Sequence, residues 1–178
     1  SHRSFRGVAI DLTAEGFARL PGSAWGLDDR TMARFGHAAG LTLPDSRGPQ
    51  RYMQRAAFVA QHEEAWLAWR ARQVSDFYRR VHAEIERSRP GAQLLLLGSQ
   101  LFESNELAAE LVPALPRRAN HDRALLLAGI DPRAYVDGGG RILLRPQIIG
   151  RNDDPHTWAP AVQCNHSQQL DRLFAAAA

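Results

Sequence analysis

The feature that most constrains this fold is an amphipathic helix followed at once by an apolar strand. Between Glu64 and Ser88, apolar side chains recur at steps of three and four residues, which gives one apolar helix face. The sequence RPG at 89–91 ends this helix, and Gln93 to Gly98 (QLLLLG) is then predicted as a buried strand. A helix, a tight turn and a continuous apolar strand form half of a βαβ unit, which indicates a parallel sheet.

Two further strands and several helices are predicted around this unit. Gly7 to Leu12 (GVAIDL) is expected to be a buried strand, and Arg141 to Ile149 (RILLRPQII) a third strand with a bulge or sheet edge at its proline. Residues 13–63 carry many turn signals and predict a long loop with one short helix, Asp29 to Ala39. Helices are also expected at 101–128, with a break near its two prolines, and at 170–178. This alternation of strands and helices predicts an α/β fold.

Length and composition indicate one globular domain. The chain has 178 residues, of which 44% are hydrophobic and 23% charged, and no apolar run approaches the roughly 18 residues of a membrane span. A complete eight-stranded α/β barrel needs roughly 250 residues. We therefore expect residues 1–178 to be a single domain that forms part of a TIM (β/α)8-type barrel within a larger protein. The rest of that parent chain, or an oligomer partner, would cover its open strand edges.

Charge and cysteine content limit the classes of partner and cofactor that we expect. All 22 basic residues are arginines, and 19 acidic residues interspersed among them leave a net charge of only +3. Because the arginines form no stripe, we expect no nucleic-acid partner. The single cysteine, Cys164, excludes an internal disulfide, and no H-E-x-x-H or phosphate-loop motif occurs, so no metal and no cofactor are expected. The first six residues lack the apolar core of a signal peptide, and export would require a signal in a longer precursor.

Candidate catalytic groups follow the predicted strands, because active groups in parallel α/β folds lie beyond the carboxyl ends of strands. The first strand delivers Asp11, and the second is followed by Glu103. Two carboxylates from different strand ends are what glycoside hydrolysis requires, so we predict this pair as catalytic and in one cleft. Substrate-binding residues expected around the pair are Glu15, Trp25, Gln100, Arg145 and Trp158.

These residues also have structural interpretations. Asp11 could cap a loop or pair with an arginine, Glu103 could lie in a solvated first helical turn, and Trp25 could pin its own loop. Trp66 and Trp69, at the start of the long helix, are expected to pack against the fold. A serine esterase is a further alternative, because Ser99 follows a strand and residues 153–156 contain a D-x-x-H spacing, although the G-x-S-x-G motif is missing.

The order of several motifs resembles a known family. Residues 2–12 (HRSFRGVAIDL) are similar to the start of a central strand in clan-A-type glycoside hydrolase barrels, and similar motifs follow in order. They are Leu20-Pro21-Gly22, WGLDD at 25–29, Arg34-Phe35, GLTLP at 40–44, Arg51-Tyr52 and AWLAWR at 65–70, with Phe77 and RPG at 89–91 downstream. Over roughly residues 2–150 the chain resembles bacterial "family 10 glycosylhydrolase-like" proteins and, more distantly, the β-galactosidases of glycoside hydrolase family 42.

This resemblance implies a TIM-barrel catalytic domain that acts on carbohydrate. In the family 42 enzymes the corresponding strand ends in Asn-Glu, whereas Leu12 and Thr13 stand at those positions here, and the nearest acids are Asp11 and Glu15. Two functions therefore stay open. The chain is either the central part of a glycoside-hydrolase-like enzyme domain, or a non-catalytic carbohydrate-binding or structural barrel module. A glutamate at the end of a later strand in the flanking sequence would favour the enzyme.

Overall fold

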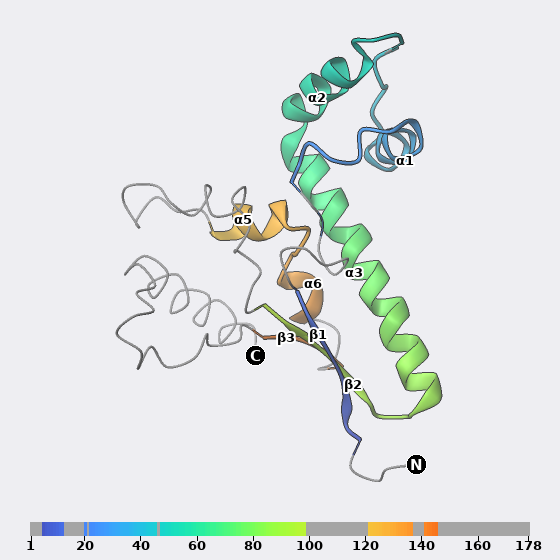
Figure 1. Ribbon diagram of the computed structural model, residues 1–178, viewed down its shortest axis with the longest axis vertical. Helices are drawn as coiled ribbons and strands as arrows, with labels where there is room; N and C mark the ends of the chain where they lie inside the picture. Colours follow the sequence, from blue (N-terminus) through green and yellow to red (C-terminus); the bar gives the residue numbers. More distant parts are fainter. Residues whose placement is uncertain are drawn as a thin grey trace, which may run out of the picture.

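The described part of the chain forms a three-stranded parallel sheet with helices in both crossovers (Figure 1). The structure, a computed structural model, describes residues 5–12, 20, 22–45, 47–98, 121–136 and 141–145. The strands are β1 (Gly7–Asp11), β2 (Gln93–Leu97) and β3 (Ile142–Arg145), and they lie in the order β1-β2-β3. Both neighbouring pairs are parallel, which confirms an α/β chain with strands at the three predicted positions. Residues 146–149 of the third predicted strand lie outside the described residues.

Within the described residues, three helices connect β1 to β2 and two precede β3. The first three are α1 (Asp29–Ala39), α2 (Arg51–Gln61) and α3 (Glu63–Ser88), and the others are α5 (His121–Leu127) and α6 (Arg133–Val136). The bounds of α1 are those predicted, and α3 begins one residue earlier and runs unbroken for 26 residues. Of the helix predicted over residues 101–128, only α5 falls within the described part. The helix predicted at 170–178 lies outside it.

The long loop expected over residues 13–63 is wrong in one segment, because residues 51–61 form α2. Only Arg55 and Val59 of this helix are buried, and its apolar residues Tyr52 and Met53 are exposed. His62 then separates α2 from α3, with φ −120° and ψ 33°. One of the two buried positions is an arginine whose partners lie 26 and 28 residues earlier in the chain. Arg55 thus joins α2 to the start of α1, while Val59 and Phe58 pack on the hydrophobic core.

One face of the sheet packs on the helices. Leu94 and Leu96 of β2 are completely buried, and they pair in register with Val8 and Ile10 of β1. Leu67, Val74 and Tyr78 of α3 belong to the same core, as do residues of the α5–α6 segment, namely Leu125, Leu127, Ala128, Ile130 and Tyr135. Val81 and Ile85, which belong to the apolar face predicted for this helix, are half-buried against this core. The apolar face of α3 is therefore the one that the sequence indicates.

The opposite face of the sheet has a different character. Ala9 and Asp11 of β1 are exposed, and Leu95 and Leu97 of β2 are half-buried. Because side chains alternate along a strand, these residues point away from α3. The carboxyl end of β1 lies on the side of the sheet where α1, α2 and the beginning of α3 extend (Figure 1). The sheet thus offers one covered face and one face that carries a carboxylate at its carboxyl end.

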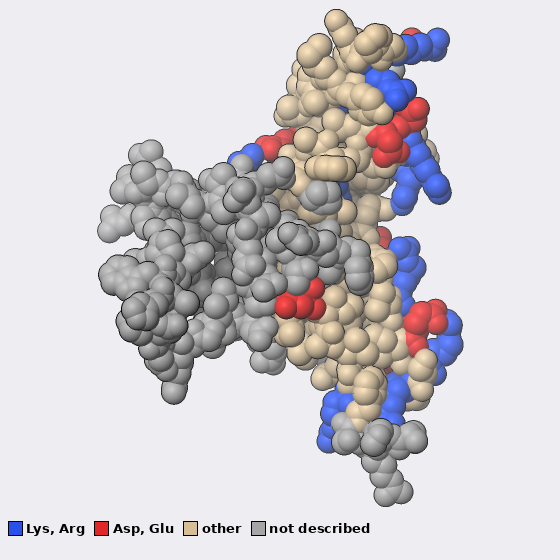
Figure 2. Space-filling view, viewed as in Figure 1, with Lys and Arg blue, Asp and Glu red and all other residues tan. Residues whose placement is uncertain are grey.

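The surface over α3 carries charges of both signs. Figure 2 shows arginines and acidic residues interspersed along this edge of the molecule. Two ion pairs join neighbouring turns of α3, Arg79 with Asp76 at 2.9 Å and Arg87 with Glu84 at 2.6 Å. Among the helices that the structure describes, none has both the length and the apolar character to cross a membrane.

Candidate functional site

The carboxyl ends of the three strands lie in one row. Asp11 is in register with Leu97, and Leu97 is in register with Arg145. With neighbouring strands about 4.8 Å apart, the backbones of Asp11 and Arg145 stand roughly 10 Å from each other. The carboxyl group of Asp11 belongs to an exposed residue at the strand end. Two of the predicted site residues are thus placed at the same edge of the sheet.

Several predicted site residues lie outside the described part of the chain. These residues are Glu15, Gln100, Glu103 and Trp158, together with Ser99, Asp153 and His156 of the esterase alternative. The shared cleft of Asp11 and Glu103 therefore stays a prediction. Trp25, by contrast, is described, and it lies at a pocket that the sequence did not indicate as a unit.

This pocket lies between the β1–α1 connection, α1 and the first three turns of α3. Its volume is about 330 Å³. We call it the tryptophan pocket, and its lining consists of Leu20, Trp25, Gly26, Thr31, Arg34, Trp66, Trp69, Arg70 and Gln73. Four of these residues stand on α3 at positions 66, 69, 70 and 73, a spacing that places them on one helix face.

Stacked aromatic rings support the pocket. Trp66 is completely buried, and its ring stacks on Trp69 with centroids 5.3 Å apart and planes 21° from parallel. Phe35 of α1 meets Trp66 edge to face at 4.9 Å. The prediction that Trp66 packs against the fold is confirmed. Its indole N–H also donates a hydrogen bond of 3.0 Å to the carbonyl oxygen of Ser23, which joins the β1–α1 connection to α3.

Trp25 lies at the mouth of the pocket and keeps 62% of its surface exposed. The next residue, Gly26, has φ +89°, which side chains rarely allow. A Cβ atom at Gly26 would also come within 3.3 Å of the Thr31 methyl carbon. A glycine therefore lets the connection turn closely over Trp66 while its neighbour Trp25 stays in solvent.

Two arginines give the pocket its charge. Arg70 is buried, its Nη2 donates to the Gly22 carbonyl oxygen at 3.1 Å, and its guanidinium lies 5.8 Å from the centre of the Trp66 ring. Burial lowers the pKa of Arg70 to about 10, so this side chain remains cationic at neutral pH. Arg34 of α1 is exposed, and its Nη2 donates to Oε1 of Gln73 at 2.6 Å.

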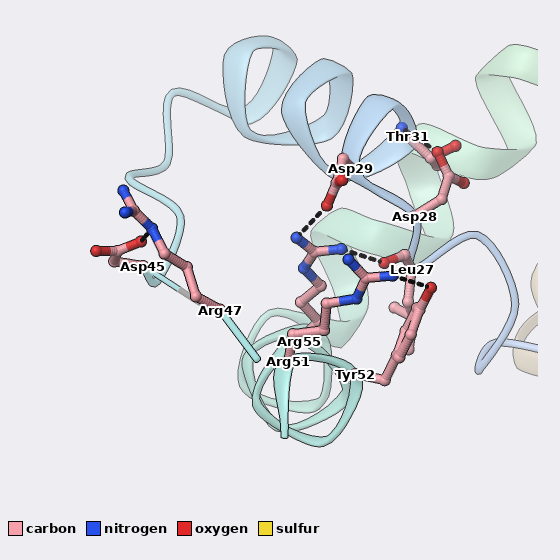
Figure 3. A network of polar contacts seen from close by, with 9 residues as sticks. All are labelled: Leu27, Asp28, Asp29, Thr31, Asp45, Arg47, Arg51, Tyr52 and Arg55. Atoms are coloured by element: carbon pink, nitrogen blue, oxygen red, sulfur yellow. Dashed lines mark hydrogen bonds and ion pairs between the residues drawn. The ribbon is translucent and has the colours of Figure 1, made fainter. Parts of the chain in front are cut away.

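A polar network fixes the start of α1, which supplies Thr31 and Arg34 to the pocket (Figure 3). Arg55 of α2 donates from Nη1 to the Leu27 carbonyl oxygen at 2.8 Å and from Nη2 to the carboxylate of Asp29. Asp28 caps the helix by accepting the Thr31 backbone N–H at 3.0 Å. Hydrogen bonds from Thr31 lower the pKa of Asp28, so the cap stays ionised.

The pocket can bind and orient a ligand through flat rings, guanidinium groups, one amide and one hydroxyl. None of the described residues that line it is acidic, so the described lining offers no carboxylate for acid or base catalysis. Sequence reasoning found Trp25 but missed Thr31, Arg34, Arg70 and Gln73. The W-x-x-W-R pattern at 66–70 was a usable signal, because it places two rings and a cation on one face of a helix.

Comparison with protein-family models, with curated proteins and with solved structures finds no match for this chain. Any functional conclusion therefore rests on the residues at the strand ends and in the tryptophan pocket.

Proposed function

We propose that this chain is the central part of a glycoside-hydrolase-like (β/α)8 barrel that acts on O-glycosidic bonds of carbohydrate. The observation that carries this proposal is the position of Asp11, an exposed carboxylate at the carboxyl end of a parallel strand. Arg145 ends β3 in the same row. In (β/α)8 enzymes, catalytic residues come from the carboxyl ends of several strands.

The different surroundings of the two sheet faces support the proposal of a barrel. Consecutive strands of a (β/α)8 barrel are neighbours and parallel, with helices on the outside and a packed interior of side chains. Here β1, β2 and β3 are consecutive neighbours, and α3 packs on one face only of the sheet they form. On the other face stand Ala9, Leu95, Leu97 and Leu143, which in a closed barrel would point inward.

The proposed chemistry uses two carboxyl groups. One protonates the leaving oxygen, and the other acts as a base toward water or as a nucleophile on the sugar. We assign Asp11 to this pair with Glu103, which follows β2, as its partner. A separation of about 5–5.5 Å between the two carboxyl groups would give retention of configuration, and about 6.5–9.5 Å would give inversion.

The test is hydrolysis of a panel of aryl-glycosides by the full-length polypeptide that contains this chain. Asp11→Asn should lower turnover at least about 100-fold, because general acid–base groups contribute factors of roughly 10² to 10⁴. Asp45→Asn is the matched control, since Asp45 is an exposed loop carboxylate paired with Arg47. Its turnover should be that of the parent. Equal turnover in Asp11→Asn and the parent, with hydrolysis present in both, would remove Asp11 from the catalytic pair.

The tryptophan pocket favours a second candidate, a non-catalytic carbohydrate-binding module. Exposed tryptophan faces beside hydrogen-bonding side chains suit a sugar ring, and the described lining holds no carboxylate. Binding of sugars without hydrolysis of any aryl-glycoside would support this module. Any flanking sequence of the parent polypeptide gives an independent test, because a glutamate at the end of a further strand would favour the enzyme and its absence would favour the module.

A further inference from the structure

The tryptophan pocket combines a flat apolar surface with positive charge. Trp25 exposes most of its ring at the mouth, and Trp69 stacks on the buried Trp66 behind it. The apolar faces of sugar rings pack on such indole surfaces. A volume of about 330 Å³ stands at the lower end of small-ligand pockets, roughly 300–1,000 Å³, and fits one ring rather than a long oligosaccharide.

Arg34 supplies a cation at this surface. Its guanidinium is planar and presents five N–H donors, of which one contacts Gln73. Among the described residues, no carboxylate forms an ion pair with Arg34. Guanidinium groups match the geometry of carboxylates and bind them through paired hydrogen bonds. The neighbouring amide of Gln73 and hydroxyl of Thr31 can serve ring hydroxyl groups.

Arg70 adds a second positive charge behind the rings. It is buried, and its position is fixed by the Gly22 carbonyl oxygen. With two guanidiniums and no acidic residue in its described lining, the pocket favours an anion over a neutral or cationic ligand. The rings favour a ligand with an apolar face rather than a bare ion.

We propose that the tryptophan pocket binds a pyranose ring that carries a carboxylate, as in a uronic acid. Arg34 holds the carboxylate, and Trp25 covers the face of the ring. This inference rests on the proposed carbohydrate function and narrows it to acidic sugars. It assigns the pocket, whose described lining does not include Asp11, to substrate binding.

Three probes distinguish binding of the sugar ring from binding of the carboxylate. D-glucuronate carries ring and carboxylate, D-glucose carries only the ring, and acetate carries only the carboxylate. Calorimetry on the full-length polypeptide should give the highest affinity for glucuronate, by about tenfold or more over either of the other two. Equal affinity for glucose and glucuronate would show a neutral-sugar site, and equal affinity for acetate and glucuronate would show a simple anion site. If glucuronate does not bind, the pocket is not a uronic-acid site. Each of these three results overturns the inference.

Variants locate the site. Arg34→Met should reduce glucuronate affinity about tenfold or more and leave glucose affinity unchanged. Trp25→Ala should reduce the affinity for both sugars. Both side chains belong to exposed residues, so the variants should fold, and their melting temperatures check this. The matched control is Arg47→Met, because Arg47 is an exposed arginine already paired with Asp45. An unchanged glucuronate affinity in Arg34→Met overturns the assignment.

The outcomes also separate this inference from the proposed function. One outcome is that neutral aryl-glycosides are hydrolysed in an Asp11-dependent way, while glucuronate does not bind through Arg34. This outcome would overturn the acidic-sugar pocket but would still support the proposed enzyme. Arg34-dependent binding of glucuronate without hydrolysis of any aryl-glycoside would overturn the enzyme and leave the pocket as the site of a binding module.

Discussion

The indole nitrogen of Trp66 lies 3.0 Å from the backbone carbonyl oxygen of Ser23, to which it donates a hydrogen bond. Because Trp66 is completely buried on α3, this bond fastens the β1–α1 connection to the core. We expect Trp66→Phe to lose the donor and part of the ring volume, and to lower the free energy of unfolding by about 2 kcal/mol. Urea denaturation at neutral pH measures this change.

The control for this prediction is Trp25→Phe, which makes the same exchange at an exposed tryptophan of the same pocket. Its free energy of unfolding should change by less than about 0.5 kcal/mol. If both variants unfold at the same urea concentration, the hydrogen bond to Ser23 does not stabilise the fold.

Gly7 of β1 permits the close approach of β2. A Cβ atom built at this position would come within 2.2 Å of the backbone oxygen of Gln93, and a strand backbone cannot move aside as a flexible side chain can. We expect Gly7→Ala to destabilise the protein by about 2 kcal/mol or more. Thermal unfolding followed by circular dichroism tests this, with Arg6→Ala as the control, because it introduces the same methyl group at the exposed position just before Gly7. A Gly7→Ala variant as stable as the control would contradict the packing.

The strands and α3 were predictable because their signals are local. The run QLLLLG places four leucines between turn residues, and α3 repeats apolar side chains with the period of a helix. Both patterns involve residues close together in the sequence, so they can be recognised without knowledge of the tertiary contacts. Their parallel pairing followed from the helical crossover between them.

The second helix and the pocket were not predictable in the same way. Arg55, a buried residue of α2, obtains its partners from Leu27 and Asp29, far earlier in the chain. The pocket likewise joins Trp25 and Arg34 to the face of α3 that begins at Trp66. Contacts between residues 26 to 48 positions apart leave no periodic pattern, so sequence reasoning found single residues of the site rather than its shape.

Arg55 should be important for the position of α1. It is only 9% exposed, and it bridges a backbone carbonyl oxygen and a carboxylate at the start of that helix. Arg55→Met would leave the Leu27 carbonyl oxygen without this donor, and we expect a loss of about 2 kcal/mol in the free energy of unfolding. Asp29→Asn should cost less than about 1 kcal/mol, because the Asp29 side chain is largely exposed to solvent.

Chemical denaturation of both variants measures the difference. Arg55→Met should in addition weaken glucuronate binding at the tryptophan pocket, because α1 carries Thr31 and Arg34. Equal losses of stability in the two variants would mean that the ion pair, rather than the bond to the Leu27 carbonyl oxygen, provides the stabilisation.

Stability at alkaline pH should depend on Tyr78. Burial raises the pKa of this phenol to about 12, whereas the unfolded chain releases the proton near pH 10. The folded state therefore binds more protons than the unfolded state between about pH 10 and 12. The stability linked to Tyr78 is fully present below pH 10 and is lost as the pH rises through 12. Burial also raises the pKa of Tyr135, which acts in the same direction.

We expect Tyr78→Phe to lose less stability than the parent protein between pH 9 and pH 11.5, by on the order of 2 kcal/mol, because the variant has no phenol to ionise on unfolding. Arg70, whose pKa burial lowers to about 10, changes stability in the opposite sense, but it is present in both proteins and cancels in the comparison. Urea midpoints across this pH range measure the effect. Tyr52→Phe, at an exposed position on α2, is the matched control and should follow the parent. Parallel pH profiles for the parent and Tyr78→Phe would show that the buried phenol does not set the alkaline limit of the fold.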